Sequence, residues 1–199
     1  MSSRKSIFFW GSRALVLFTL GALAGPLGDL CHVLSKTDGY PVSHGSYRIF
    51  GLLPIWVPVL FGCAGVGIGI SHLKWGNRTK PAGFREASIG IIAFLLLYAA
   101  SGFLPAHLGS TKDLFMAAAA GAMWGKLDGS LKGAALGLGI AANGAGIEIL
   151  LVHFGVFYYL PDSSQFHGIP TWLPWLYFAA SAAVGNAART LGKTQRLSS

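Results

Sequence analysis

Apolar residues in this chain form long blocks, and most charged residues fall between the blocks. Because the hydrocarbon core of a bilayer is about 30 Å thick, a helix needs about 20 mostly apolar residues to cross it. Six blocks approach this length and are predicted to be membrane-spanning helices. They cover residues 13–34, 52–73, 87–105, 113–126, 131–155 and 170–191. The fourth block is the shortest, and its short turn to the fifth predicts an antiparallel pair of helices.

Composition supports an all-α, polytopic membrane protein with one domain over residues 1–199. Hydrophobic residues make up 53% of the chain and charged residues only 11%, whereas soluble domains are about 25% charged. The first 25 residues have the basic start and apolar stretch of a signal peptide. Because the apolar block continues to Leu34, we expect an uncleaved first span.

The distribution of lysine and arginine predicts that both termini are cytoplasmic. With six spans, twelve of the 15 basic residues fall on the side of the termini. The exceptions are Lys36, Arg48 and Lys112. The net charge of +8 includes no basic run of five, so we expect no nucleic-acid partner.

Glu148 is the most unusual residue of the fifth block, where it lies in the stretch GAGIEILLVHFG. On a helix, Gly137, Ala141 and Gly144 lie on the same stripe as Glu148. Small residues at this spacing mark a face that packs against another helix, so the carboxyl is predicted to point into the bundle. Two roles remain open: a hydrogen bond to a ligand in an intramembrane pocket, or a structural bond to another helix.

The candidate site rests on Glu148 and on a few polar or aromatic side chains of the other spans. The remaining predicted lipid-contacting residues are Asn143, Gly144, Asp29, His32 and Trp124. Trp56 and Trp172 stand in the similar stretches PIWVPVLF and PTWLPWLY, and are predicted to anchor helix starts at the outer membrane interface.

Signatures of catalysis are absent from the sequence. None of the six histidines has the HExxH spacing, and neither a phosphate-binding loop nor a G-x-S-x-G motif occurs. Neither Cys31 nor Cys63 has a CxxC partner. We therefore expect no enzyme activity, no cofactor and no metal site, and we expect loop residues such as Asp38 and Asp162 to be solvated.

Several stretches together resemble the Insig (insulin-induced gene) family. They are GVFYYLPD, WLPWLYFA, VGNAARTL, WGKLDGSLKGAALGLGIA and WVPVLFGCAGVGIG, in the family's order and spacing. The resemblance covers most of residues 13–193. The family's span-five glutamine aligns with Ile149, beside Glu148, and its double tryptophan of span four is reduced to Trp124 and Gly125. These departures favour a divergent or bacterial homologue.

The resemblance implies a non-enzymatic, lipid-binding regulator with six spans. It implies diacylglycerol or a sterol as the ligand, a membrane-protein partner, and a partner-binding role for Asp128, whose alternative is a helix cap or an ion pair with Lys126 or Lys132. The glycine-rich faces indicate a homo-oligomer. The location would be the bacterial cytoplasmic membrane or, in a eukaryote, the endoplasmic reticulum. The rival interpretation is a small-molecule or lipid transporter, which would require more polar residues near the bilayer midplane.

Overall fold

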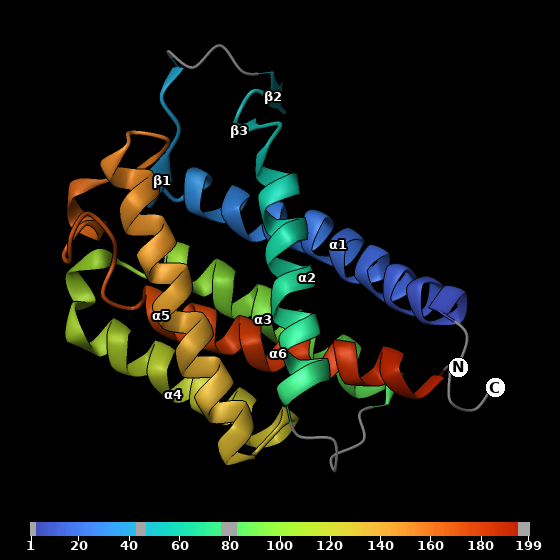
Figure 1. Ribbon diagram of the computed structural model, residues 1–199. Coiled ribbons are helices and arrows are strands. Elements are labelled where there is room, and N and C mark those ends of the chain that lie inside the picture. Colours follow the sequence, from blue (N-terminus) through green and yellow to red (C-terminus); the bar gives the residue numbers. More distant parts are fainter. Residues whose placement is uncertain (1–2, 43–46, 77–82, 195–199) are drawn as a thin grey trace.

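The computed structural model of the chain describes residues 3–42, 47–76 and 83–194, and within them it contains six α-helices (Figure 1). The helices are α1 (Ser3–Leu34), α2 (Val57–Trp75), α3 (Phe84–Phe103), α4 (Ser110–Leu127), α5 (Leu131–His153) and α6 (Leu173–Thr194). All six predicted helices are therefore present. The basic residues Arg78, Lys80 and Arg196, which were counted on the cytoplasmic side, lie outside the described residues.

The helix boundaries differ most from the prediction at the starts of α1 and α2. Helix α1 begins at Ser3 and includes the basic N-terminal segment. Helices α2 and α6 begin later than predicted, because the residues before them form a strand or turns. The prolines inside the first turns of α2 and α6 are Pro58 and Pro174, where the missing backbone N–H has no intrahelical partner to lose.

Among the described residues, four helices are long and apolar enough to cross a membrane. They contain the segments Trp10–Leu34, Val57–Trp75, Phe84–Phe103 and Leu131–His153. Their outward faces carry exposed apolar side chains such as Leu23, Ile92, Leu96 and Leu150. Exposed large apolar residues on several helices mark a surface that is covered by lipid or by another protein. The chain is therefore a multi-pass membrane protein.

Helix α6 is the centre of the bundle and packs against α2, α3, α4 and α5 (Figure 1). It contains the buried polar residues Ser181, Asn186 and Arg189, which lower its apolar content relative to the four segments above. Because these side chains face other helices, they do not require contact with lipid.

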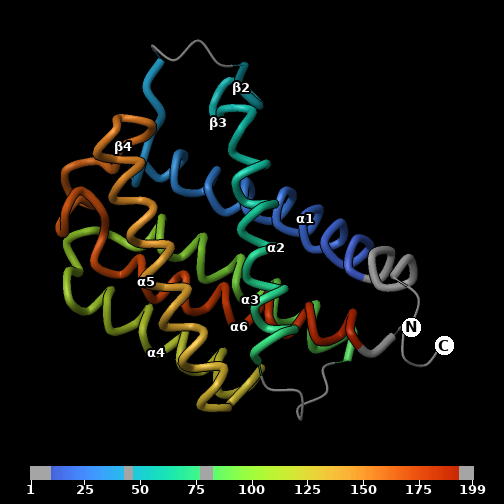
Figure 2. The backbone as a smooth tube through the Cα atoms, in the orientation of Figure 1, coloured from blue at the N-terminus to red at the C-terminus, as the bar shows by residue number. Residues whose placement is uncertain are grey.

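Short strands close one end of the bundle, which we call the β end. Strand β1 (Asp38–Gly39) follows α1 and pairs antiparallel with β4 (Tyr158–Tyr159), which follows α5. Figure 2 shows the blue segment after α1 meeting the orange segment after α5. Strands β2 (Arg48–Ile49) and β3 (Leu53–Pro54) form a second small hairpin before α2. The β1–β4 pair ties the end of α1 to the end of α5.

The opposite end of the bundle contains the turn between α4 and α5. The start of α1 and the end of α6 also meet there, where Arg13 donates from Nη2 to the Gly192 carbonyl at 3.3 Å. An even number of helices places the start of the first and the end of the last at the same end, as the sequence predicted.

Glycines allow close contact of α1 and α2, where Gly21 and Gly25 of α1 and Gly65 and Gly69 of α2 each stand four residues apart. A Cβ atom at Gly65 would lie 2.7 Å from the Leu17 carbonyl oxygen, and one at Gly21 would overlap the Phe61 carbonyl oxygen. The two backbones can approach this closely only without side chains at these positions. By contrast, a Cβ at Gly121 would meet no atom within 4 Å, so this glycine does not mediate packing within the described chain.

Candidate functional site

A cavity of about 520 Å³ lies within the bundle, near the β end. Helices α1, α2, α3, α5 and α6 and both strands of the β1–β4 pair contribute to its wall. Most of the wall is apolar, and the polar side chains include Asp29, Asp38, Asn143 and Glu148. Ligand pockets of about 300–1,000 Å³ with mostly apolar walls and a few polar groups are typical of small-molecule and cofactor sites.

Glu148 lies on the wall of this cavity and accepts two hydrogen bonds from tyrosines. The Tyr159 hydroxyl donates to Oε2 and the Tyr177 hydroxyl donates to Oε1, each at 2.5 Å. The expected contact with another helix is therefore present through Tyr177 of α6.

Gly144 makes the contact between Tyr177 and Glu148 possible. A Cβ atom at Gly144 would lie 2.6 Å from a carbon of the Tyr177 ring, so any larger residue would displace the ring. The stripe predicted from the sequence is correct here: Gly137 and Ala141 are also buried on this face of α5. Small residues thus serve to bring α6 close enough for its tyrosine to reach the carboxyl.

The structural bonds of Glu148 leave room for a ligand. A carboxylate oxygen has two lone pairs and can accept more than one hydrogen bond. The Glu148 side chain also lines a smaller void of about 70 Å³, which shares Phe61, Tyr98 and Tyr177 with the larger cavity. The carboxyl therefore stands where the two cavities meet.

The other predicted lipid-contacting residues divide into two groups. Asn143, Gly144 and Asp29 line the large cavity together with Glu148. His32 and Trp124 are not among its lining residues. His32 is buried behind the wall, and the Trp124 indole donates to the Ser130 carbonyl at 3.2 Å.

The two tryptophans predicted as interface anchors have different environments. Trp56 is half-buried, lines the cavity and packs edge-on against Tyr40, with ring centroids 5.7 Å apart. Trp172 is only 2% exposed, so its ring is covered by protein and is not open to contact with lipid headgroups. It packs against His32 instead, and the Lys112 ammonium lies 5.0 Å from the centre of its ring.

Asp128, the predicted partner-binding residue, is buried in the turn between α4 and α5. Its Oδ2 accepts from Nη1 of Arg189 at 2.7 Å, and its other oxygen accepts from the Ser130 backbone N–H and hydroxyl. Ser130 in turn caps α5 by accepting from the Gly133 N–H. The alternative of an ion pair with Lys126 or Lys132 is not what the structure shows, because Asp128 pairs with Arg189 of α6.

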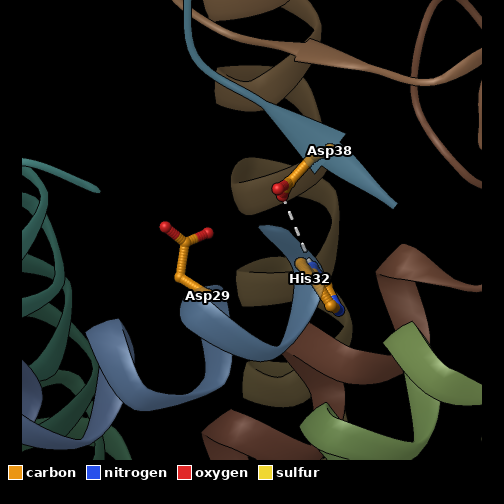
Figure 3. A group of neighbouring side chains, drawn as sticks. All are labelled: Asp29, His32 and Asp38. Atoms are coloured by element: carbon orange, nitrogen blue, oxygen red, sulfur yellow. Dashed lines mark ion pairs between the residues drawn. The ribbon is translucent and has the colours of Figure 1, made fainter. Parts of the chain in front are cut away.

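Asp38 was expected to be solvated, but the structure buries it beside Asp29 and His32 (Figure 3). An Oδ2 atom of Asp38 lies 3.5 Å from Nδ1 of His32, and Asp29 accepts from the Tyr40 hydroxyl at 2.7 Å. Burial raises the pKa of the Asp38 carboxyl to about 8. Sequence reasoning missed this group; the signal was the Asp-x-x-His spacing, which places both side chains on one helix face.

Comparisons with known proteins identify relatives along most of the chain. An Insig homologue of Mycolicibacterium vanbaalenii is 34% identical over 168 residues, which are 84% of this chain and 81% of the relative. The insulin-induced gene 1 protein of Xenopus laevis is 28% identical over 184 residues, 90% of this chain and 72% of the relative. No family model matches the sequence.

Solved structures give the same result. The crystal structure of a mycobacterial Insig homologue from Mycobacterium vanbaalenii superposes with a TM-score of 0.84 and 31% sequence identity, over 91% of this chain and 94% of that one. A cross-linked trimer of a variant of that homologue superposes equally well. Sequence and fold agree over nearly the whole bundle, and the chain therefore belongs to the Insig family.

Proposed function

We propose that this chain is a non-enzymatic lipid-binding protein that holds a diacylglycerol or a sterol in the cavity between α1, α2 and α5. The observation that carries the proposal is a mostly apolar cavity of about 520 Å³ with a few polar groups on its wall, among them the Glu148 carboxyl. Both ligands are mostly apolar and carry one hydroxyl, so a few hydrogen-bonding groups in an apolar pocket match their chemistry.

Glu148 is proposed to accept a hydrogen bond from the lipid hydroxyl. Tyr159 and Tyr177 already donate to it, which fixes the direction of both carboxylate oxygens. A pre-oriented acceptor costs less entropy on binding than a free side chain. Asn143 and Asp29 stand elsewhere on the same wall and are proposed to contact polar parts of the ligand.

The protein is proposed to span the membrane six times, with both termini in the cytoplasm. Helices α4 and α6 would then cross the bilayer among the four strongly apolar helices. The proximity of Arg13 and Gly192 supports termini on one side, and the excess of basic residues on that side supports a cytoplasmic orientation. The β end would face the other side of the membrane.

Self-association and a membrane-protein partner complete the proposal. The cross-linked trimer of the mycobacterial homologue and the open surface around Gly121 support a homo-oligomer, because small residues allow close helix contacts in membranes. Asp128 is proposed to act on a partner through the shape of the α4–α5 turn, since its carboxylate is bonded within the chain.

Native mass spectrometry of the protein purified in mild detergent tests the lipid site. The wild-type chain should retain one adduct with the mass of a diacylglycerol or a sterol. Glu148→Leu should lose it, because the hydroxyl then has no acceptor. Gly139→Phe should also lose it, since Gly139 lines the cavity and its Cβ position is open, so a phenyl ring fills the space without a backbone clash.

Gly11→Phe is the matched control, because a Cβ at Gly11 also meets no atom within 4 Å and Gly11 does not line the cavity. It should retain the lipid. Wild-type protein without any adduct, and without competitive binding of either lipid class, would contradict the proposal and favour the transporter interpretation. Equal lipid retention by Glu148→Leu would leave Glu148 with its structural role alone.

A further inference from the structure

Asp29, His32 and Asp38 form a buried group at the β end, beside the proposed lipid site. Each offers one atom that can bind a metal ion, and these three atoms all lie within 4.8 Å of one another. The exposed fractions of the three residues are 4%, 1% and 5%. Figure 3 shows Asp29 and His32 on successive turns of α1, with Asp38 directed towards them from β1.

Hydrogen bonds define which nitrogen of His32 carries the proton. The Ser101 hydroxyl donates its only proton to the Tyr98 carbonyl at 2.7 Å. Its oxygen lies 2.7 Å from Nε2 of His32. With the hydroxyl proton directed to Tyr98, this oxygen accepts from an N–H at Nε2, and the ring is assigned the tautomer with its proton there. In the neutral ring, Nδ1 then has no proton and presents its lone pair to the side of Asp38.

The lone pair of Nδ1 faces an oxygen of Asp38 at 3.5 Å. Two acceptors at this distance repel each other unless a positive charge or a proton lies between them. The other oxygen of Asp38, Oδ1, is buried and has no hydrogen-bond partner among the residues that the structure describes. An unpartnered buried carboxylate oxygen is costly. Asp38 therefore indicates that a ligand binds between these side chains and contacts the carboxylate.

The positive residues nearby do not supply that charge. Among the described residues, no lysine or arginine nitrogen lies within 4.0 Å of either carboxylate. Lys112 is buried close by, but it donates to the Leu104 carbonyl and lies over Trp172. Arg48 donates to backbone carbonyls, including those of Tyr40 and Pro41.

We propose that Asp29, His32 and Asp38 bind a divalent cation of the zinc class. With metal–nitrogen and metal–oxygen distances of about 2.0–2.2 Å, two tetrahedral ligands stand about 3.4 Å apart, close to the 3.5 Å between Nδ1 and Oδ2. Metal binding requires both carboxyls to release their protons. The two carboxylates and the neutral imidazole then carry a charge of about −2, which a divalent ion neutralises, and this donor set suits zinc.

The surroundings of the group match those of a metal site. Ser101 holds the ring through Nε2 and Tyr40 holds Asp29, and hydrogen bonds of this kind orient the ligands of metal sites. Asp29 and Asp38 line the large cavity, so a cation can enter from it and its open coordination position faces the cavity. The ion would join α1 to β1, and through the β1–β4 pair to the end of α5.

Metal titration of untagged protein in detergent tests the site directly. The protein is stripped with a chelator, incubated with Zn²⁺, separated from free ion and analysed for zinc by mass spectrometry. The wild type should retain one equivalent per chain. Cobalt(II) in place of zinc should give the visible absorption of a low-symmetry nitrogen–oxygen site. The bound ion should also raise the temperature of thermal unfolding, because it binds only the folded chain.

Asp38→Asn, Asp29→Asn and His32→Gln should each weaken zinc binding by more than about 100-fold, beyond the roughly 10–100-fold typical of losing a residue that only hydrogen-bonds to a metal ligand. Asp162→Asn and His107→Gln are matched controls on exposed residues of the same end and should bind as the wild type does. Wild-type protein that retains no zinc would overturn the proposal, whether or not a variant folds. So would ligand variants that bind zinc as tightly as the wild type. The titration does not depend on the lipid, so its outcome is separate from that of the lipid experiment.

Discussion

Asp128 and Arg189 form a buried ion pair that holds the α4–α5 turn against the central helix. Asp128 is 4% and Arg189 is 8% exposed, and Arg189 also donates to the Leu127 carbonyl at 2.8 Å. Buried ion pairs are expensive to form, but removing one partner alone is more expensive, because the other charge stays buried without compensation. The two charges therefore stabilise each other, and substitution of one of them reveals how much the folded state depends on the other.

Substitution of one partner at a time should strongly lower the free energy of unfolding, because the other charge stays buried without compensation. Asp128→Leu and Arg189→Leu should each lower the free energy of unfolding by about 3–5 kcal/mol. The double variant should be more stable than the sum of the two losses predicts, because it leaves no unpaired charge. Thermal unfolding in detergent measures all three.

Asp162→Leu is the control for this experiment, since Asp162 is exposed and makes no ion pair among the described residues. It should change the unfolding temperature little. Strictly additive losses in the double variant would contradict the interpretation that Asp128 and Arg189 stabilise each other.

Helices α1 and α2 illustrate how element packing depends on single small residues. Gly21 and Gly65 place the two backbones in direct contact, with Leu17 and Phe61 carbonyls as the nearest atoms. Their contact also shapes the cavities, because Gly21, Gly65 and Phe61 line the smaller void. A change in the spacing of α1 and α2 would therefore also change the shape of the proposed lipid site.

Gly21→Ala should destabilise the α1–α2 contact, because a methyl group there would overlap the Phe61 carbonyl, and a backbone atom cannot swing away. We expect a loss of about 1–3 kcal/mol, the usual cost of overpacking. Gly67→Ala should not cause this loss, since a Cβ at Gly67 meets no atom within 4 Å. Comparison of the two apparent unfolding temperatures measures the difference; equal temperatures would refute the close-contact role of Gly21.

At the scale of the whole molecule, the proposed orientation places the β end outside and the α4–α5 turn inside. Asp162 lies beyond the end of α5 and Lys132 near its start, and both are exposed. After replacement of Cys31 and Cys63 by alanine, Asp162→Cys should react with a membrane-impermeant maleimide on intact cells. Lys132→Cys should react only after the membrane is opened.

Reversed labelling of the two cysteines would contradict cytoplasmic termini but not the fold. Labelling of both on intact cells would contradict an odd number of crossings between them. The labelling pattern thus separates the orientation of the bundle from its internal packing.

The sequence by itself determined the helices and the family. Long apolar blocks allow little other than membrane helices, because unsatisfied backbone groups are too costly in lipid. The stripe of Gly137, Ala141 and Gly144 beside Glu148 gave the inward direction of that carboxyl, since helical spacing alone sets which residues share a face. The motifs around Trp124, Asp128 and Tyr177 gave the family, which the comparisons confirmed.

Only the tertiary structure decided which distant side chains meet. Tyr177 reaches Glu148 from another helix, Arg189 reaches Asp128, and Asp38 folds back over His32 because β1 pairs with β4. Such contacts depend on how helices cross and on where loops return, and local patterns carry no information about either. Trp172 shows the same limit: its position before a helix suggested the membrane interface, but the packing of α1 against α6 and the loop before it buried the ring.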